Sequence, residues 1–198
     1  LAAAAMAPER LNVALNDTGS GMKKSKAKVK LADKARVEHA DFETLSIKKN
    51  VFDCAFACEV LNTVADKARL IDVIREGLKP QGALMLYDYF VKEEHKTAPE
   101  VQRWSADGNP HPWTLAEAKA MLAGAGFDLR VVKDMTAEAR SDILRAFGGF
   151  VLDHKRGDIA APLIRPLLHV TAHWAERVAL IDAGMLEVCK LQAFRTGN

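Results

Sequence analysis

The stretch FDCAFACEVLNTV, residues 52–64, decides how the chain is expected to fold. Its first half, FDCAFAC, is apolar except for Asp53. A continuous apolar run bounded by polar residues is typical of a strand that is buried on both faces of a parallel sheet. The run ends at Cys58 and is followed by Glu59 and Asn62. An ordinary turn at this point would not require a carboxylate and a side-chain amide. Because ligands bind outside the carboxyl ends of the strands in open α/β sheets, we interpret this end as a binding edge.

Strand and helix patterns alternate on both sides of this stretch. Residues 66–78 have the one-sided apolar spacing of an amphipathic helix, and the breaker Lys79-Pro80-Gln81-Gly82 ends it. Thr114 and Glu117 form a capping box that opens another helix. This rhythm predicts an open α/β sheet with helices on both faces. We expect strands at 37–40, 51–58, 83–89, 127–132 and 186–194, and helices at 2–15, 66–78, 114–123, 137–153 and 159–183.

The composition excludes several classes of protein. The net charge is +2, with 49% apolar and 27% charged residues, so no global charge attracts nucleic acid. No apolar run approaches the ~18–20 residues that span a bilayer, so we expect no membrane segment. The turn-rich NDTGSG at 16–21 predicts a loop. The basic stretch at 23–36 predicts either a solvated loop or an anion-attracting rim near a site.

Two sets of residues have the spacing of metal ligands. Cys54 and Cys58 lie in one apolar run, but no second Cys/His pair follows at ligand spacing. With Cys189 they make an odd number, which favours buried, reduced thiols in a cytoplasmic protein. His169 and His173 lie one helical turn apart, but the sequence shows no acidic third ligand nearby. We therefore expect no metal site.

A set of motifs in fixed order carries a family resemblance. The first motifs lie in segment 52–89, FDCAFACEVLNTVADKARLIDVIREGLKPQGALMLYDY. A predicted strand is followed by Val60-Leu61 and Val64, and then by a helix. Leu78-Lys79-Pro80-Gln81-Gly82 ends the helix and leads into a further strand. Downstream, the segments 113–117 and 123–127 form a "T…E…L…AGF" helix. The chain thus resembles class I S-adenosylmethionine-dependent methyltransferases of the small-molecule type, over about residues 37–132 and in the last strand. The resemblance implies a Rossmann-like α/β sheet, mostly parallel, with an antiparallel final strand beside 83–89.

The resemblance also implies where S-adenosylmethionine would bind. Asp41 would accept a hydrogen bond from the adenine amino group, and Phe42 would offer its backbone amide to the ring. Cys58 and Glu59 would lie near the methionine end, and Leu61 would pack beside the cofactor. Alternatives remain for three of these residues: Asp41 could cap a turn, Glu59 could cap the following helix, and Leu61 could belong to the core.

The chain departs from the family pattern at its start. The glycine-rich loop after the first strand and the acidic residue that ends the second strand have no counterpart, since no apolar strand precedes NDTGSG. We therefore expect the chain to be the carboxyl-terminal part of a single methyltransferase domain, with its N-terminal strands missing. Residues 2–15 would be the helix after the second strand. A chain without these motifs should bind the cofactor weakly.

The acceptor side is marked by aromatic residues. Tyr87 and Tyr89 end one strand, and His111 and Trp113 lie in the loop DGNPHPW. Histidine can deprotonate a hydroxyl or an amine near neutral pH, although His111 could also be a plain loop residue. No catalytic residue is identified, because methyl transfer mainly requires alignment of the acceptor.

The helical insertion at 137–183 could have one of three roles. It could cover the sheet, form a lid over an apolar acceptor pocket, or form the face of a homodimer. The function expected from the sequence is S-adenosylmethionine-dependent methylation of a small molecule, with no nucleic acid or membrane as partner. The alternative is a non-catalytic, methyltransferase-like interaction subunit.

Overall fold

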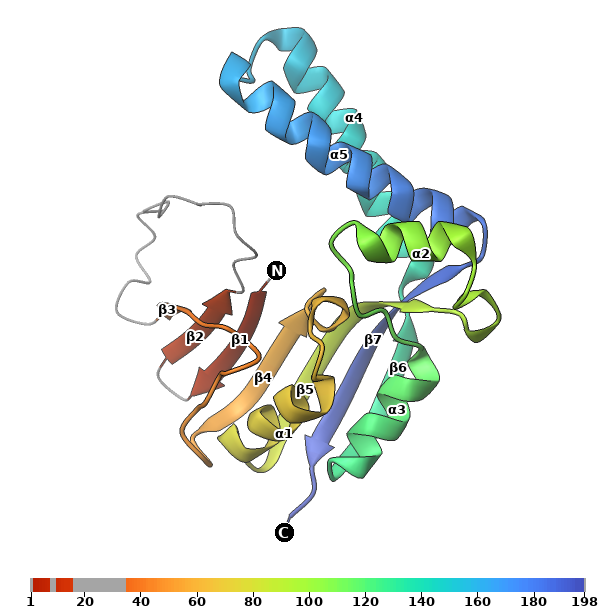
Figure 1. Ribbon diagram of the computed structural model, residues 1–198. Helices are drawn as coiled ribbons and strands as arrows, with labels where there is room; N and C mark the ends of the chain where they lie inside the picture. Colours follow the sequence, from red (N-terminus) through yellow and green to blue (C-terminus); the bar gives the residue numbers. More distant parts are fainter. Residues whose placement is uncertain (1, 8–9, 16–34, 198) are drawn as a thin grey trace.

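The protein folds around one twisted sheet with helices on both sides (Figure 1). The computed structural model describes the backbone of residues 2–7, 10–15 and 35–197, and the side chains of residues 40–197. The predicted loop at 16–21 and most of the basic stretch at 23–36 lie outside the described residues.

Seven described strands form the sheet, in the order β3-β2-β1-β4-β5-β7-β6. Strands β2 to β6 run in one direction, while β1 and β7 run in the opposite one. By pairing, however, the sheet is mostly antiparallel and not mostly parallel as predicted: β2–β3 and β4–β5 are parallel neighbours, and the other four pairs are antiparallel. The strands are β1 (Ala2–Ala7), β2 (Arg10–Leu15), β3 (Ala35–His39), β4 (Phe52–Cys58), β5 (Leu78–Val91), β6 (Phe127–Asp134) and β7 (Leu186–Arg195).

The last strand confirms the predicted topology. β7 lies between β5 and β6 and is antiparallel to both, with Tyr87 opposite Lys190 and Tyr89 opposite Val188. The turn before it contains Gly184, whose φ of 71° is in the left-handed region that favours glycine.

The β4–α1–β5 unit follows from its local sequence. Helix α1 (Lys67–Gly77) begins where the Asp66 carboxylate accepts a hydrogen bond from the Arg69 amide at 2.9 Å. β5 begins earlier than predicted, at Leu78, because the breaker residues 79–82 form an irregularity within the strand. The pairing with β4 jumps there from Leu78 to Ala83. A Cβ on Gly82 would lie 2.8 Å from the Lys79 carbonyl oxygen, so glycine fits this bulge.

The remaining helices agree with the predictions except for one that the sequence did not indicate. Helix α3 (Leu115–Gly124) has the predicted capping box, with both Thr114–Glu117 hydrogen bonds present. Helices α4 (Thr136–Arg156) and α5 (Ala161–Asp182) match the predicted insertion. Helix α2 (Pro99–Ala106) was not predicted, and two single 3₁₀ turns lie at Leu61–Thr63 and Glu93–His95.

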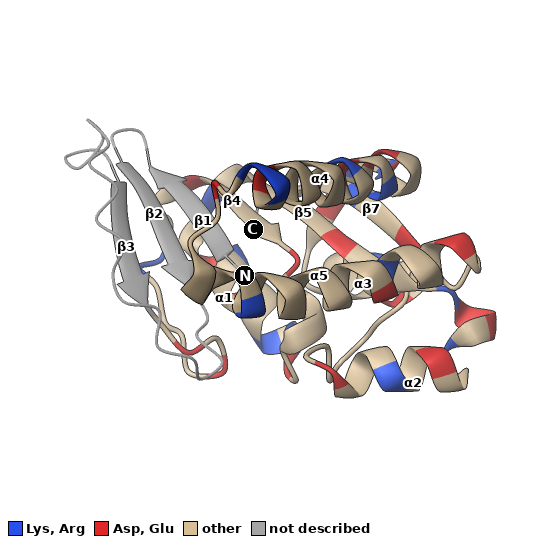
Figure 2. Ribbon diagram, turned by 90° about the horizontal axis from the view of Figure 1, so that it is seen from above, with Lys and Arg blue, Asp and Glu red and all other residues tan. Residues whose placement is uncertain are grey.

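Two groups of buried side chains occupy the two faces of the sheet. On one face, Leu84 and Leu86 of β5 pack with Leu70 of α1 and Leu122 of α3. On the other face, Tyr89 and Val188 pack with residues of α2, α4 and α5. The α4–α5 pair, called the hairpin below, covers the carboxyl ends of the central strands and then extends away from the sheet (Figure 1). Acidic and basic residues lie within residues 136–145 and 153–156 of its α4 helix, and residues 146–152 between them carry no charge (Figure 2).

The prediction of a helix at 2–15 is wrong. These residues form β1 and β2, an antiparallel pair in which Ala2 lies opposite Leu15. Strand β1 also pairs with β4, where Ala2 lies opposite Cys58. Alanine favours a helix by less than ~1 kcal/mol per residue over most other residues, so hydrogen bonds to two neighbouring strands override that preference.

The cysteines are less buried than the sequence indicated. All three are free thiols, but Cys54 and Cys58 are half-buried and Cys189 alone is fully buried. Cys54 and Cys58 lie on the face of β4 that the hairpin leaves partly open, where Phe56 is also exposed. Among the described helices, none combines the length and the apolar character needed to cross a bilayer.

Candidate ligand-binding site

The chain leaves β4 through an unusual backbone turn at Glu59. Its φ is 54°, in the left-handed region that few residues other than glycine adopt, and its amide donates to the Tyr87 carbonyl oxygen at 2.8 Å. Such strain of ~1–3 kcal/mol persists only where the surroundings fix it, and it often occurs at functional sites. The turn places the Glu59 side chain beside Tyr87, at the predicted binding edge.

A cavity of about 420 Å³ opens at this edge, between the sheet and the hairpin. Most of its lining is aromatic or aliphatic, and two carboxylates, Glu59 and Asp142, also border it. The predicted acceptor residues Tyr87 and Tyr89 both line it. The lining comprises Glu59, Tyr87 and Tyr89 from the sheet, Ala139, Asp142, Ile143, Ala146, Phe147 and Phe150 from α4, and Leu167, Val170, Thr171 and Trp174 from α5. We call this space the pocket.

An arginine on α5 stands beside the acid in the pocket. The Arg177 guanidinium lies 5.1 Å from the ring centroid of Tyr89 and 4.5 Å from that of Trp174, and its Nη1 is 4.0 Å from the Glu59 carboxylate. Burial raises the pKa of Glu59, and the positive charge of Arg177 opposes that rise. The predicted alternative that Glu59 caps a helix is not observed, because Asp66 caps α1.

The two tyrosines remain neutral at physiological pH. Burial, and then the nearby Glu59 charge, raise the pKa of Tyr87 to about 12 and also raise that of Tyr89. Their hydroxyl groups can therefore donate hydrogen bonds to a ligand, while their rings provide apolar surface.

A buried carboxylate between the two tyrosines was not among the predicted site residues. Asp88 is 2% exposed and accepts hydrogen bonds from the Leu61 amide (3.0 Å), the Asn62 side chain (2.7 Å) and the Tyr89 amide (2.9 Å). Burial raises its pKa to about 7, against the effect of these three donors. We call this set the Asp88 cluster. The sequence signal that could have identified Asp88 was the presence of an aspartate within an apolar strand that is buried on both faces.

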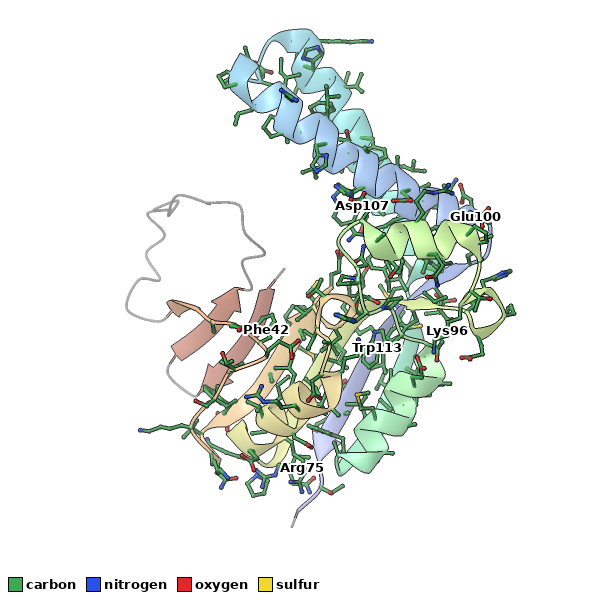
Figure 3. The ribbon with its side chains drawn as sticks, viewed as in Figure 1. Phe42, Arg75, Lys96, Glu100, Asp107 and Trp113 are labelled. Atoms are coloured by element: carbon green, nitrogen blue, oxygen red, sulfur yellow. The ribbon has the colours of Figure 1, made fainter. Side chains whose placement is uncertain are left out.

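The other two predicted acceptor residues are not among the residues that line the pocket, and Trp113 belongs to the core on the opposite face of the sheet. Trp113 is buried, packs against Phe90 at 5.4 Å between ring centroids, and lies 5.8 Å from the Lys67 ammonium (Figure 3). The His111 amide donates to the Asn62 carbonyl oxygen at 3.0 Å. Burial lowers the pKa of Lys67 to about 8. The structure thus joins Tyr87 and Tyr89 in the pocket and separates His111 and Trp113 from it.

The residues predicted to hold the adenine lie near the start of α1. The exposed Asp41 carboxylate accepts from the Glu43 amide at 3.0 Å, which is a turn-capping bond. Phe42 is buried in the core, and its carbonyl oxygen accepts from Arg69 (Figure 3). The Glu43 carboxylate accepts from the Ala65 amide at 2.9 Å, which ties this segment to the loop after β4.

The remaining predicted cofactor contacts differ in accessibility. Leu61 is completely buried in the core beside α1. Cys58 is half-buried at the end of β4, and burial raises the pKa of its thiol to about 11, so it is not a nucleophilic thiolate. Within the described residues, no group of three or more His, Cys, Asp or Glu side chains could hold a metal ion.

Comparison with known families gives one match. Residues 1–86 match the family described as a methyltransferase domain. This segment ends inside β5, so it contains most of the motif segment 52–89, including Glu59, but not the downstream motifs at 113–117 and 123–127. No curated protein matches the chain.

Solved structures share the fold at low sequence identity. A phosphoethanolamine N-methyltransferase 2 from Haemonchus contortus has a TM-score of 0.71 and 16% identity, over 83% of this chain and 38% of its own. A geranyl diphosphate C-methyltransferase from Streptomyces coelicolor A3(2) has a TM-score of 0.65 and 13% identity, over 84% and 55%. The [4+2]-cyclase SpnF has a TM-score of 0.61 and 22% identity, over 85% and 58%.

These comparisons agree with the resemblance: residues 1–86 match a methyltransferase domain, and the solved structures share the fold that the resemblance implies. The chain spans between 38% and 58% of the length of the three solved proteins. The similarity therefore concerns a shared part of the fold.

Proposed function

We propose that this protein, which has the class I methyltransferase fold, transfers a methyl group from S-adenosylmethionine to a small molecule. One observation carries the proposal: the pocket opens at the carboxyl ends of β4 and β5, in a chain whose residues 1–86 match a methyltransferase domain. In an open α/β sheet, ligands bind at this edge.

The residues at this edge fit the sulfonium end of the cofactor. When bound, S-adenosylmethionine supplies an electrophilic methyl group on a positively charged sulfur. The aromatic face of Tyr87 and the carboxylate of Glu59 attract a cation, and the positive charge of Arg177, which lies 4.0 Å from Glu59 and against Trp174, opposes part of that attraction. At the other end, the exposed carboxylate of Asp41 would accept a hydrogen bond from an exocyclic amine.

The proposed cofactor contacts remain those that the resemblance implied. They are the Asp41 carboxylate, the Phe42 backbone, and Cys58, Glu59 and Leu61 at the end of β4. The bond from the Glu43 amide supports the position of Asp41 because it fixes the orientation of that carboxylate. Leu61 would act through its backbone and the core beneath it, since its side chain is buried.

The pocket supports an acceptor with a substantial apolar part. Phe147, Phe150 and Leu167 supply apolar surface, and a volume of about 420 Å³ suits a small molecule. The Tyr87 hydroxyl would orient a polar group of the acceptor, and Glu59 would accept a hydrogen bond from its nucleophile. The named reactions of the solved relatives, on phosphoethanolamine and geranyl diphosphate, agree with a small-molecule acceptor but do not select one.

The test is a transfer assay with a labelled methyl group. The protein is purified in a form that also carries the family's N-terminal motifs, because a chain without them is expected to bind the cofactor weakly or not at all. It is incubated with S-adenosylmethionine carrying a deuterated methyl and with fractions of small amines, phenols and isoprenoids, and the products are examined by mass spectrometry. We expect the label in a small molecule and S-adenosylhomocysteine in equal amount. Glu59→Gln should lower the rate, while Glu100→Gln, on the exposed surface of α2, should not. Formation of S-adenosylhomocysteine without any labelled product would contradict the proposal.

A second candidate function is a non-catalytic interaction subunit. The observation in its favour is the outer half of the hairpin, where Leu152, Leu163 and Leu168 are each more than half exposed. The same surface supports the proposed homodimer. Sedimentation analysis and calorimetry together distinguish the two candidate functions. An interaction subunit without cofactor affinity should associate with a partner in sedimentation, and its titration with S-adenosylhomocysteine should release no heat. A cytoplasmic location is also proposed, supported by the three free thiols.

A further inference from the structure

Two histidines on α5 lie with their ring nitrogens facing each other, away from the pocket lining. His169 Nε2 and His173 Nε2 are 3.1 Å apart, and the ring planes are nearly perpendicular at 84°. Both side chains reach solvent. Neither residue is used by the proposed methyl transfer.

An aspartate from another element holds one of the two rings. The Asp107 carboxylate, at the end of α2, lies 2.9 Å from His173 Nδ1 (Figure 3). A carboxylate only accepts hydrogen bonds at neutral pH, so His173 carries its proton on Nδ1. In the neutral form of this ring, Nε2 then presents a lone pair toward His169. The sequence could not show this contact, because Asp107 and His173 are far apart in the chain.

The geometry points to a metal site: we propose that His169 and His173 together bind one divalent transition-metal ion of the Zn²⁺, Ni²⁺ or Cu²⁺ type. An ion about 2.05 Å from each Nε2 would see the two nitrogens, 3.1 Å apart, at an angle of about 98°. This value lies between those of octahedral and tetrahedral coordination. Without metal, the His169 Nε2–H group donates to His173. On binding, that proton moves to His169 Nδ1, so both lone pairs face the ion.

Asp107 plays the part of an outer-shell residue in this site. Metal-binding histidines commonly donate their second N–H to a carboxylate, which fixes the ring and makes the other nitrogen more basic. Within the described residues no third His, Cys, Asp or Glu completes the group, so water would fill the remaining positions. Imidazole ligands favour the borderline transition metals over Mg²⁺ and Ca²⁺.

The site would connect two parts of the structure. His173 precedes Trp174, which lines the pocket, while Asp107 begins the loop that leads to Trp113. A bound ion would keep His173 oriented toward Asp107 and so hold α5 against the end of α2. This inference does not depend on methyl transfer.

The test is metal binding by protein from which every affinity tag has been removed. Calorimetric titration with NiCl₂, ZnCl₂ or CuCl₂ should show one ion per chain, and MgCl₂ should show none. We expect His169→Gln and His173→Gln each to weaken binding at least tenfold, and Asp107→Asn to weaken it about tenfold. His154→Gln, an exposed histidine on α4, is the matched control and should leave binding unchanged.

A second readout identifies the coordinating atoms. In ¹⁵N spectra of the imidazoles, Zn²⁺ should shift the Nε2 signals of His169 and His173 and leave both rings protonated at Nδ1. Absence of one-to-one binding, or binding that both glutamine variants retain, would overturn the proposal and leave a hydrogen-bonded histidine pair.

Discussion

The Asp88 cluster and the outer half of the hairpin are built in opposite ways. Asp88 is almost inaccessible, and three N–H groups donate to its carboxylate. Leu152 and Leu163 of the hairpin are more than half exposed, at 53% and 55%. The strand ends beside the pocket are thus fixed by buried polar contacts, while the outer half of the hairpin carries exposed apolar side chains. Substitutions on the sheet side should therefore change stability, and those on the hairpin should change ligand binding.

The largest expected effect is that of Asp88→Ala. Removing the carboxylate leaves the buried Leu61 and Tyr89 amides without their acceptor, at ~1–3 kcal/mol for each group, and removes one of the two acceptors of the Asn62 side-chain nitrogen, which still donates to the Tyr89 carbonyl oxygen. We expect the free energy of unfolding, measured in urea, to fall by about 3 kcal/mol or more.

The control for this variant is Asp72→Ala, which removes an exposed carboxylate from α1 and should change stability by less than about 0.5 kcal/mol. If both substitutions have similar small effects, the contrast between the two regions does not hold.

We expect the exposed Asp41 carboxylate to contribute more to cofactor binding than to stability. Because a charge-assisted hydrogen bond is worth ~1.5–3 kcal/mol, Asp41→Ala should weaken S-adenosylhomocysteine about 10- to 150-fold by calorimetry. Stability should change by less, since the variant loses one exposed turn-capping bond. Asp72→Ala is again the control. Glu43→Ala is unsuitable because Glu43 binds the Ala65 amide. An unchanged affinity for S-adenosylhomocysteine would show that Asp41 only caps a turn.

The Asp88 cluster should also give stability a particular pH dependence. The pKa of Asp88 is about 7 in the folded protein and about 3.8 when unperturbed. Between these values the folded protein binds a proton that the unfolded chain has released, so the free energy of unfolding falls as the pH rises. The slope would be at most about 1.4 kcal/mol per pH unit. Urea unfolding of wild type and Asp88→Asn between pH 5 and about 7 checks this. Parallel curves would contradict it.

The smallest effect is expected on the hairpin. Leu152→Ala removes a side chain that is already more than half exposed to solvent. The free energy of unfolding, measured by thermal unfolding, should therefore change by less than about 0.5 kcal/mol. Leu86→Ala, in the core beneath the pocket, should cost ~2–5 kcal/mol. A large loss for Leu152→Ala would show that this surface is covered in solution, as in a dimer.

The sequence predicted the parts of the fold that local patterns control. The strand at 52–58, the capping box at Thr114 and the antiparallel last strand are all observed, but the prediction that the strand is buried on both faces is wrong, because only Ala55 and Ala57 of it are buried. The helix predicted at 2–15 failed because pairing with β4 decides those residues, and strand pairing over this distance leaves no local pattern. Helix α2 was missed because its eight residues contain only a short apolar pattern.

The site was predictable only where it follows a strand end. Glu59, Tyr87 and Tyr89 were selected because they end strands, and the structure brings them together. Arg177 was missed because its role depends on packing between Tyr89 and Trp174, which are distant in sequence and near in space. His111 and Trp113 were selected from the loop DGNPHPW, and the sequence could not show that Trp113 packs into the core on the other face of the sheet.

The most direct test of the central claim is methyl transfer by two variants of the same hairpin. Phe147 lines the pocket, whereas Leu163 is an exposed apolar residue outside its lining. With the acceptor found in the labelling assay, Phe147→Ala should lower kcat/KM about tenfold or more, because the acceptor loses ~1.5–3 kcal/mol of apolar contact. Leu163→Ala should stay within about twofold of wild type. Equal effects of the two substitutions, or no effect of either, would contradict a pocket for the acceptor between the sheet and the hairpin.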